Sequence, residues 1–328
     1  MLRLLDGDDV RTCAPAAAAV DAVADAFVAA HRGDVVMPSK SYVDLPRYGG
    51  DFRAMPAYVD GGSWDAAGLK WVNSHPENPE RFDLPTVMGV MVYSDPETAR
   101  PLAVLDGVEL TRLRTGAAAA VATDHLAVAD ASSLGLVGAG AQSYAQLRFV
   151  ASVRPVERVV VADADPEATA ALVDHATEEG FDARAGSVAE AAACDVVSST
   201  TPVTEPIVER SAVGERTHLN AMGADAAGKQ ELESAILTDA TVVIDDRDQC
   251  VHSGEISVPW EAGLLDEDAI HAELGAVVAG AAPGRTAETG ITVFDSTGLA
   301  VQDVAASHVV YERATDDDVG TEFDLLGI

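Results

Sequence analysis

The alternation of short apolar segments with helical segments after residue 132 is the feature that most constrains the fold. Apolar runs of strand length occur at 134–137, 158–163, 195–199, 218–222, 241–245 and 292–294. Helical segments lie between them, among them 141–150 and a helix that Asp165 caps and Pro166 begins. Strands that are apolar along their whole length, separated by helices, are typical of a parallel sheet with helices on both faces. We therefore predict an α/β fold with a doubly wound parallel sheet.

A glycine-rich turn follows the first of these strands. The sequence Gly138-Ala139-Gly140-Ala141-Gln142-Ser143 connects it to the helix 141–150. Gly138 permits a tight turn, and Gly140 leaves room for a pyrophosphate against the backbone. The helix N-terminus offers free N–H groups and the positive end of its dipole. Strand, turn and helix together predict a Rossmann-type dinucleotide site on Gly138, Gly140, Ala141 and Gln142.

An acidic residue at the end of the second strand indicates which dinucleotide binds. Asp163 lies 25 residues after Gly138, where a carboxylate hydrogen-bonds the ribose hydroxyls of NAD. Ala164 and Asp165 follow it, and no arginine stands nearby to accept a 2′-phosphate. We therefore predict NAD rather than NADP as the cofactor.

The N-terminal third has a different pattern. Segments 16–30 and 109–126 are rich in alanine and predict helices, whereas 35–37, 68–73, 87–93 and 102–107 are short apolar or alternating runs. Glycine and proline separate these runs, as in an antiparallel sheet with hairpins. The segment after Gly298 is helical again. We predict a second, α+β domain from residues 1–115 and 299–328, and a Rossmann domain from 116–298.

Four charged residues stand in apolar or tightly patterned surroundings. Lys70 interrupts the apolar strand 68–73 and is one of only three lysines. A buried lysine can act as an acid, a base or an anion anchor, although an edge-strand lysine could also extend into solvent. Arg53 and Arg114 could bind a substrate carboxylate or form surface ion pairs. Asp225 follows the strand 218–222 and could exchange protons with a substrate, or simply stabilise a turn.

The histidines and cysteines give weaker indications. His75, His218 and His252 have undistinguished contexts, and we interpret each as structural. No two of them have metal-ligand spacing with a carboxylate, so we predict no metal site. Cys13, Cys194 and Cys250 form an odd and scattered set, which is typical of a reduced intracellular protein. The N-terminus is acidic by residue 6 and predicts no signal peptide, so we expect a cytoplasmic protein.

The charge balance excludes two classes of partner. There are 54 acidic and 21 basic residues, for a net charge of −33. Such a chain repels nucleic-acid phosphate and anionic lipid, and no apolar run reaches the ~20 residues of a membrane span. We expect no nucleic-acid or membrane partner. Acid excess with almost no lysine indicates a halophilic surface adapted to molar salt, where screening removes the repulsion.

Taken together, six segments resemble the ornithine cyclodeaminase/mu-crystallin family. They occur in the family's order along nearly the whole chain: 53–57, 68–79, 110–118, 138–143, 220–225 and 294–303. The resemblance implies a Rossmann domain inserted into a substrate and dimerisation domain, and so a homodimer. It implies that Arg53 and Lys70 bind the substrate carboxylate, that Arg114 lies beside substrate and nicotinamide, and that Asp225 accepts a proton. It implies an NAD site from Arg114, Thr115, Gly138, Gly140, Ala141, Gln142, Asp163, Asp165, Met222, Gly223, Ser296 and Thr297.

The same resemblance implies a small amino acid or 2-oxo acid as substrate. The family holds NAD-dependent alanine dehydrogenases, ornithine cyclodeaminases and cyclic ketimine reductases, and the halophilic composition favours the first, as archaeal members have this activity. Asp60 and Asp65 match no pattern for binding the distal amine of ornithine, which weakens cyclodeamination. A non-catalytic ligand-binding protein of the mu-crystallin type stays open. Lys70 and Asp225 both remain candidates for the principal acid or base.

Overall fold

The computed structural model describes residues 1–325 and 327, which divide into two compact units. Unit 1 consists of Met1–Arg114 and Leu299–Ile328, and unit 2 of Thr115–Gly298. Helix α4 (Gly107–Leu126) begins in the first and ends in the second. No helix of the described residues combines the length and the apolar character needed to cross a membrane.

Unit 1 is built on a sheet that is antiparallel except for one pair of strands. The strand order is β16-β1-β7-β6-β5-β4-β2, with β3 also paired to β4, and β1 and β7 are the parallel pair. The strands are β1 (Leu2–Leu5), β2 (Val35–Val36), β3 (Ser41–Leu45), β4 (Gly50–Asp60), β5 (Asp65–Ser74), β6 (Val87–Ser94), β7 (Pro101–Asp106) and β16 (Thr321–Phe323). β4 and β5 form the long central hairpin.

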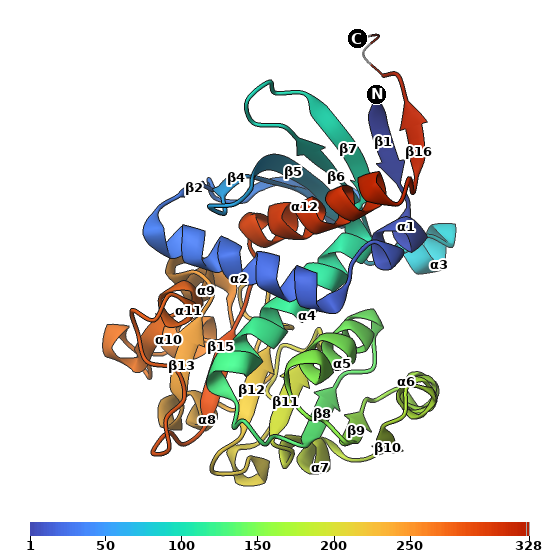
Figure 1. The fold of residues 1–328 in the computed structure, drawn as a ribbon. Helices are drawn as coiled ribbons and strands as arrows, with labels where there is room; N and C mark the ends of the chain where they lie inside the picture. Colours follow the sequence, from blue (N-terminus) through green and yellow to red (C-terminus); the bar gives the residue numbers. More distant parts are fainter. Residues whose placement is uncertain (326, 328) are drawn as a thin grey trace. The chain divides into compact units, whose positions relative to one another are not determined.

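Helices cover one face of this sheet. α2 (Ala16–Arg32) and α12 (Ala300–Asp316) pack against each other, and α12 crosses β4, β5 and β6 (Figure 1). The side chains of a strand alternate between its two faces, so every second residue of β5 faces these helices. Ala66 and Lys70 are buried, whereas Leu69 and Trp71 are exposed. The remaining helices of this unit are α1 (Gly7–Thr12) and α3 (Asn78–Phe82).

Unit 2 contains an entirely parallel sheet in the order β10-β9-β8-β11-β12-β15-β13-β14. Its strands are β8 (Ser133–Val137), β9 (Arg158–Ala162), β10 (Asp182–Ala185), β11 (Val196–Ser199), β12 (His218–Ala221), β13 (Thr241–Ile244), β14 (Ile270–Glu273) and β15 (Thr292–Asp295). The chain adds β9 and β10 on one side of β8 and then returns to place β11 on the other. The strand order therefore reverses between β8 and β11, which is where ligands bind in such sheets.

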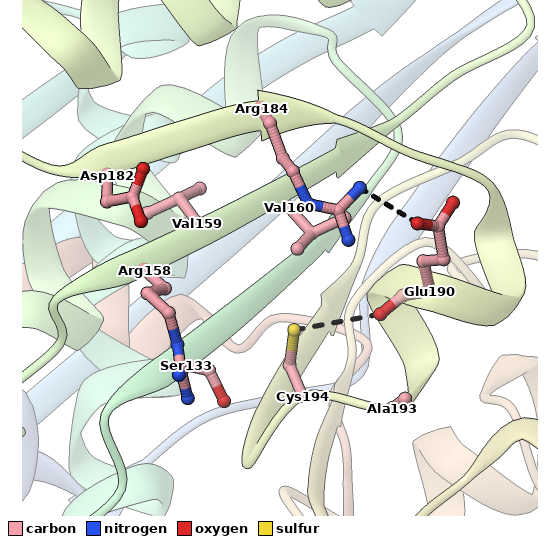
Figure 2. Close-up of a pocket in the computed structure, with 9 residues that line it drawn as sticks. All are labelled: Ser133, Arg158, Val159, Val160, Asp182, Arg184, Glu190, Ala193 and Cys194. Carbon is pink, nitrogen blue, oxygen red and sulfur yellow. Dashed lines mark hydrogen bonds and ion pairs between the residues drawn. The ribbon is translucent and has the colours of Figure 1, made fainter.

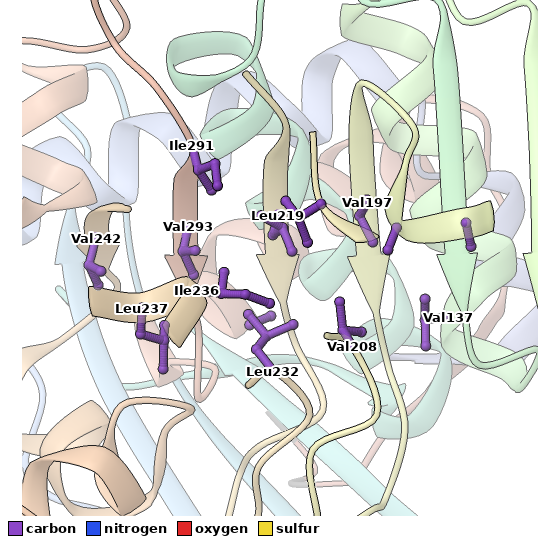
Figure 3. Packing of buried hydrophobic residues seen from close by; sticks show 14 of the residues in the cluster. Val137, Val197, Val208, Leu219, Leu232, Ile236, Leu237, Val242, Ile291 and Val293 are labelled. Carbon is purple, nitrogen blue, oxygen red and sulfur yellow. The ribbon is translucent and has the colours of Figure 1, made fainter. Parts of the chain in front are cut away.

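Helices and short 3₁₀ turns connect these strands. They are α5 (Ala141–Val153), α6 (Pro166–Glu178), α7 (Val188–Ala192), η1 (Arg210–Ala212), α8 (Ser234–Asp239), α9 (Arg247–Ser253), α10 (Ser257–Glu261), η2 (Glu267–Ala269) and α11 (Leu274–Val278). Branched apolar residues from neighbouring strands, including Val137, Val197, Leu219, Val293 and Val242, form a core with Ile236 and Leu237 of α8 (Figure 3). The parallel sheet and the separate, mainly antiparallel sheet confirm the predicted fold class.

Candidate functional site

The glycine turn of unit 2 lies at the point where the strand order reverses. Gly138 follows β8 with φ +98°, a conformation that side-chain-bearing residues rarely adopt. A Cβ atom there would lie 3.1 Å from Thr200 Oγ1 and 3.1 Å from Thr201 Cγ2, in the loop after β11. Ser143 Oγ donates to the Gly138 carbonyl over 2.6 Å and lies 2.9 Å from Thr200 Oγ1. These contacts hold the two loops of the crevice side by side.

The residues of this turn fit a pyrophosphate group. Gly140 is the N-cap of α5, and a Cβ at this position would have no atom within 4 Å, so its backbone is approachable. Among the described residues, no side chain caps the helix. The first N–H groups of a helix have no partner within it, so Ala141 and Gln142 can present theirs to an anion. A dinucleotide phosphate at this position would meet backbone donors and the positive end of the helix dipole.

Asp163 connects the end of β9 to the glycine turn. One of its carboxylate oxygens accepts the Ala139 N–H over 2.6 Å, and the other accepts the Asp165 N–H over 2.8 Å. The Asp165 carboxylate accepts the N–H groups of Glu167 and Ala168 and so caps α6. Asp163 is therefore fixed beside the turn, whereas the side chain of Asp165 serves the helix. Their predicted contacts with a cofactor stay predictions.

The other predicted cofactor residues of unit 2 follow β12 and β15. Met222 and Gly223 follow β12, and Ser296 and Thr297 follow β15, its neighbour in the sheet. Their loops are tied by acidic residues that sequence reasoning missed. Gly223 N–H donates to Glu231 over 2.8 Å, and Ser296 Oγ donates to Asp245 over 2.8 Å. Neither acid belongs to a motif, so no local sequence feature indicated this role.

Asp225, the predicted proton acceptor, forms an ion pair in the structure. Lys229 Nζ lies 2.7 Å from Asp225 Oδ1, in the loop between β12 and α8. Both side chains are partly exposed. Lys229 is one of the three lysines of the chain.

Lys70 is the central charged residue of unit 1. Its side chain lies on the helix-covered face of β5 and is only 1% exposed. Its Nζ donates to Asp303 Oδ1 over 2.7 Å and to Thr111 Oγ1 over 3.2 Å. Burial lowers the pKa of Lys70 to about 8, although Asp303 opposes this shift. The structure therefore excludes a solvent-exposed edge lysine.

Arg114 belongs to the same cluster. It lies on α4, buried, and its Nε is 3.3 Å from the Asp303 oxygen that binds Lys70. Its Nη1 donates to Gln302 Oε1 over 3.2 Å. Thr115, the next residue, is buried and begins unit 2. Asp303 and Gln302 were missed as site residues, because their link to Lys70 and Arg114 spans most of the chain.

Arg53 lies near this cluster in the sheet but has a different partner. Its guanidinium donates two hydrogen bonds to the Asp51 carboxylate, from Nε to Oδ1 over 3.0 Å and from Nη2 to Oδ2 over 3.2 Å. In the β4–β5 register Arg53 pairs with Val72, and Met55 with Lys70. Arg53 and Lys70 thus share one face of the sheet as diagonal neighbours. The structure joins Lys70 and Arg114 through Asp303, whereas Arg53 is held by Asp51.

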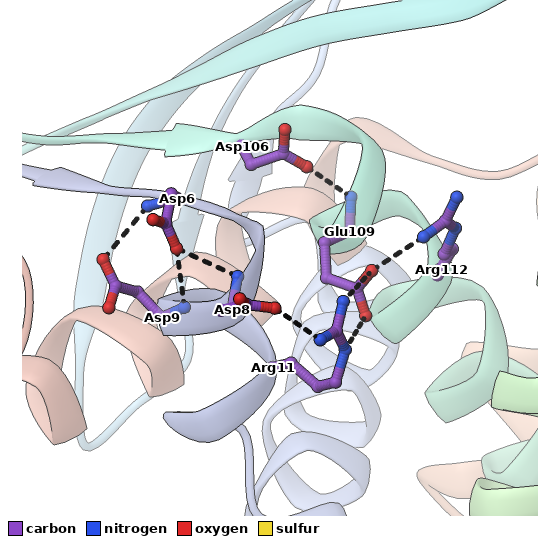
Figure 4. A network of polar contacts seen from close by, with 7 residues as sticks. All are labelled: Asp6, Asp8, Asp9, Arg11, Asp106, Glu109 and Arg112. Atoms are coloured by element: carbon purple, nitrogen blue, oxygen red, sulfur yellow. Dashed lines mark hydrogen bonds and ion pairs between the residues drawn. The ribbon is translucent and has the colours of Figure 1, made fainter. Parts of the chain in front are cut away.

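The structure also separates the two arginines near the start of α4. Arg112 pairs with Glu109 over 2.9 Å, and Glu109 in turn binds Arg11 of α1 (Figure 4). These residues border a cavity of about 700 Å³ whose lining contains neither Lys70 nor Arg114. Arg112 is therefore part of a surface network that joins α1 to α4, and Arg114 is the buried member of the pair.

A second cavity, of about 320 Å³, lies in unit 2 (Figure 2). Its lining includes Ser133, Arg158 and Asp182, which begin β8, β9 and β10. It therefore lies at the amino ends of these strands, away from the glycine turn. Arg184 of its lining pairs with Glu190 over 2.9 Å.

Of the three histidines considered, His75 and His218 have hydrogen-bond partners, with His75 Nδ1 3.0 Å from Asn73 Nδ2, and His252 is exposed on α9. His218 is fully buried, with Nδ1 2.9 Å from Thr292 Oγ1 and Nε2 3.1 Å from Asn220 Oδ1. Burial lowers its pKa to about 3, so it stays neutral. Within the part of the chain that the structure describes, no group of three or more His, Cys, Asp or Glu residues could hold a metal ion.

Fold and site define a two-unit protein with a Rossmann-type nucleotide unit and a buried lysine–aspartate–arginine cluster in the other unit. Comparison with known proteins identifies the family: residues 4–318 match the ornithine cyclodeaminase/mu-crystallin family, to which the chain belongs. It is 42% identical to an alanine dehydrogenase of Archaeoglobus fulgidus over 99% of both chains.

Two solved structures have the same fold over nearly the whole chain. One is an archaeal alanine dehydrogenase dimer with bound NAD, with a TM-score of 0.93, 42% identity and 99% of both chains covered. The other is the Thermococcus litoralis Δ1-pyrroline-2-carboxylate reductase in complex with NADH and L-proline. Its TM-score is 0.93 at 31% identity, with 98% of this chain and 100% of that chain covered.

Proposed function

We propose that this protein is an NAD-dependent alanine dehydrogenase, which converts L-alanine reversibly to pyruvate and ammonia. The observation that carries the proposal is the buried Lys70, hydrogen-bonded to Asp303 and joined through it to Arg114. A desolvated ammonium group beside a guanidinium is suited to a small carboxylate substrate and to proton transfer. Similarity to the alanine dehydrogenases over 99% of the chain supports the same activity.

We assign the residues as follows. Gly138, Gly140, Ala141, Gln142 and Asp163 would hold NAD, which supplies the hydride acceptor when bound. The predicted nicotinamide surroundings are Arg114, Thr115, Met222, Gly223, Ser296 and Thr297, with Asp165 as a further cofactor contact. The NAD-bound relative supports this cofactor.

The substrate roles fall to four charged residues. Arg53 and Lys70 would bind the substrate carboxylate, and Arg114 would lie beside it. Asp225 would face the substrate amine, and Asp225 or Lys70 would take a proton from the water that attacks the imine and return it to the departing ammonia. The Asp225 carboxylate is paired with Lys229 over 2.7 Å. Unit 1 would serve as the substrate and dimerisation domain, and unit 2 as the NAD domain.

Three alternatives differ in what they predict. An ornithine cyclodeaminase would release proline and ammonia from ornithine, and a ketimine reductase would reduce a cyclic imine, as the name of the Thermococcus relative implies for that protein. A non-catalytic ligand-binding protein of the mu-crystallin type would bind NAD without turnover. The intact set of Arg53, Lys70, Arg114 and Asp225 favours an enzyme.

A substrate screen in molar potassium chloride tests the proposal. Absorbance at 340 nm should rise steadily with L-alanine and NAD, and fall with pyruvate, ammonia and NADH. Turnover of ornithine or of a cyclic imine alone would replace the proposed substrate. Binding of NADH without turnover of any of these compounds would favour the ligand-binding protein.

We also propose a homodimer formed through the uncovered face of the unit 1 sheet. Leu69, Trp71 and Val90 are each more than one third exposed on this face, and Phe52 stacks on Trp71 at 5.1 Å. An exposed apolar sheet surface in a chain of net charge −33 fits a partner that carries the same surface. The archaeal relative is described as a dimer, which supports this assignment.

Sedimentation at molar salt checks the dimer. Wild-type protein should sediment as a dimer, and Trp71→Lys should yield monomers because it places a charge at the centre of the apolar face. Leu264→Lys, at an exposed apolar position of unit 2, is the matched control and should stay dimeric. A dimeric Trp71→Lys protein would argue for another interface.

The proposed setting is a cytoplasm of high ionic strength. The net charge of −33 and the three lysines support a halophilic surface. A small amino acid or 2-oxo acid is the proposed partner molecule, with no nucleic-acid or membrane partner.

A further inference from the structure

The buried ion cluster of unit 1 joins three elements through one carboxylate oxygen. Asp303 Oδ1, on α12, lies 2.7 Å from Lys70 Nζ on β5 and 3.3 Å from Arg114 Nε on α4. Asp303 is fully buried, and its Oδ2 has no hydrogen-bond partner among the described residues. Two cations thus share one oxygen of a single acid.

We propose that Asp303 is a positioning residue for Lys70, directing its ammonium group and holding it in the charged form beside Arg114. The part of this proposal that concerns turnover rests on the proposed function. The part that concerns Lys70 itself does not, because it can be measured without substrate.

The hydrogen bonds that Lys70 donates determine the orientation of its ammonium group. An ammonium group has three N–H donors. In the described structure one goes to Asp303 and one to Thr111 Oγ1, which accepts because its own hydrogen is donated to the Gly107 carbonyl over 2.7 Å. Two fixed partners determine the direction of the third donor, which remains for a substrate carboxylate.

Among the charged groups that face Lys70, Asp303 is the one that favours the charged form of its ammonium group. Arg114 of α4 and Lys40, in the segment before β3, both disfavour the charged ammonium, as does burial. Asp303 of α12 favours it by its charge and by its hydrogen bond. The residues paired with Lys70 in the sheet, Met55 of β4 and Met91 of β6, are apolar and uncharged. Beyond them on the same face of β4, Arg53 is paired with Asp51.

The small number of lysines makes a direct experiment possible. Selective ¹³C labelling of the lysine ε-carbons gives three signals, which Lys40→Arg and Lys229→Arg variants assign. The Lys70 signal should titrate near pH 8 in the wild-type protein. In Asp303→Asn its midpoint should fall by about one to three pH units, because an opposite charge at contact distance is removed. Lys40 and Lys229 act as internal references.

Further variants separate positioning from general stability. Asp303→Glu keeps the charge and should restore most of the midpoint. Arg114→Gln should raise the titration midpoint of Lys70, the opposite of the change expected in Asp303→Asn. This variant can be measured even if Asp303→Asn does not fold. Asp316→Asn, at an exposed position of α12, is the matched control and should leave the midpoint unchanged. The proposal is overturned if the titration midpoint of Lys70 is the same in Asp303→Asn as in the wild-type protein. If Asp303→Asn does not fold, an unchanged midpoint in Arg114→Gln overturns it instead.

The kinetic readout then tests the consequence for turnover. In Asp303→Asn, kcat/KM for alanine should fall about 10- to 100-fold, the size expected for a misplaced reacting group, with NAD affinity unchanged. The midpoint of the pH profile should move in the same direction as the NMR titration. A wild-type protein without alanine turnover, but with the expected NMR shift, would refute the proposed function and leave the role of Asp303 intact.

Discussion

At the scale of single residues, burial of the Lys70 ammonium group opposes folding unless partners compensate for the lost water. The Asp303 carboxylate and the Thr111 hydroxyl provide that compensation at 2.7 and 3.2 Å. Since the pKa of Lys70 is about 8, a small change in its surroundings moves it between charged and neutral forms near neutral pH. This property suits a residue that binds a carboxylate and exchanges protons.

Lys70→Ala should abolish most alanine turnover while leaving NAD binding nearly intact. Loss of a buried charged contact costs on the order of 2–5 kcal/mol, so kcat/KM should fall at least ~30-fold. Lys70→Arg should not rescue it fully, because a planar fork cannot replace a compact, titratable ammonium. Steady-state kinetics and tryptophan fluorescence quenching by NAD measure the two properties. Turnover close to wild type would make this lysine an ordinary strand residue.

Asp163→Ser should narrow the preference for NAD over NADP, because the carboxylate that repels a 2′-phosphate is removed. It should also weaken binding of both cofactors, since Asp163 accepts the N–H groups of Ala139 and Asp165. The ratio of kcat/KM for the two cofactors measures the effect, with the exposed Asp174→Ser as the control. If the wild-type protein uses NADP as readily as NAD, then Asp163 at the end of β9 does not select against the 2′-phosphate.

At the scale of elements, Glu231 joins the loops that follow β11 and β12. One of its oxygens accepts from the N–H and hydroxyl of Thr201, and the other from Ser199 Oγ and Gly223 N–H. The backbone N–H of Glu231 in turn donates to Glu255, which is also buried. Burial raises the pKa of both acids. A buried acid thus stabilises the strand ends beside the glycine turn.

Glu231→Gln should destabilise the protein by about 1–3 kcal/mol, because either orientation of the amide places an NH₂ group against a backbone N–H. The midpoint of thermal unfolding should fall by several degrees, and NAD should bind more weakly. Differential scanning calorimetry in molar salt and a fluorescence titration measure these changes. The exposed Glu205→Gln is the control. Unchanged stability of Glu231→Gln would show that the loops do not depend on this acid.

The elements also show which features of the fold and site could be predicted from the sequence and which could not. Apolar strand runs and the glycine turn are local patterns, so β8, α5 and β9 could be predicted from their own residues. The short strands β1 and β16 and the ion cluster depend on contacts between distant segments. Lys70 and Asp303 are 233 positions apart, and only packing of α12 on β5 brings them together. Asp303 lay within a recognised family segment, yet nothing local indicated its partner.

At the scale of the whole molecule, electrostatic repulsion between carboxylates opposes folding. Acidic residues outnumber basic ones by 54 to 21, and many basic ones are already paired across the surface. The Debye length grows from ~3 Å at 1 M salt to ~10 Å at 0.1 M, so repulsion reaches further in dilute buffer.

Dialysis from molar to dilute salt should therefore unfold the protein or dissociate the proposed dimer. Thermal unfolding monitored by circular dichroism, together with sedimentation, follows the two processes across a salt series. Equal molar concentrations of potassium chloride and of a neutral osmolyte separate screening from general solute effects. The same unfolding temperature at 0.1 M and 2 M salt would contradict the proposed adaptation to salt.

The discontinuity of unit 1 sets an order in which the chain can fold during synthesis. Unit 2 is one continuous stretch, whereas β1 pairs with β16 and β5 packs on α12, and both β16 and α12 are translated after unit 2. The nascent unit 1 therefore holds Lys70 without its acid while the ribosome completes unit 2. One face of its sheet is fully covered only after α12 has left the ribosome, so a chain terminated before α12 leaves a half-built domain exposed to proteases and chaperones.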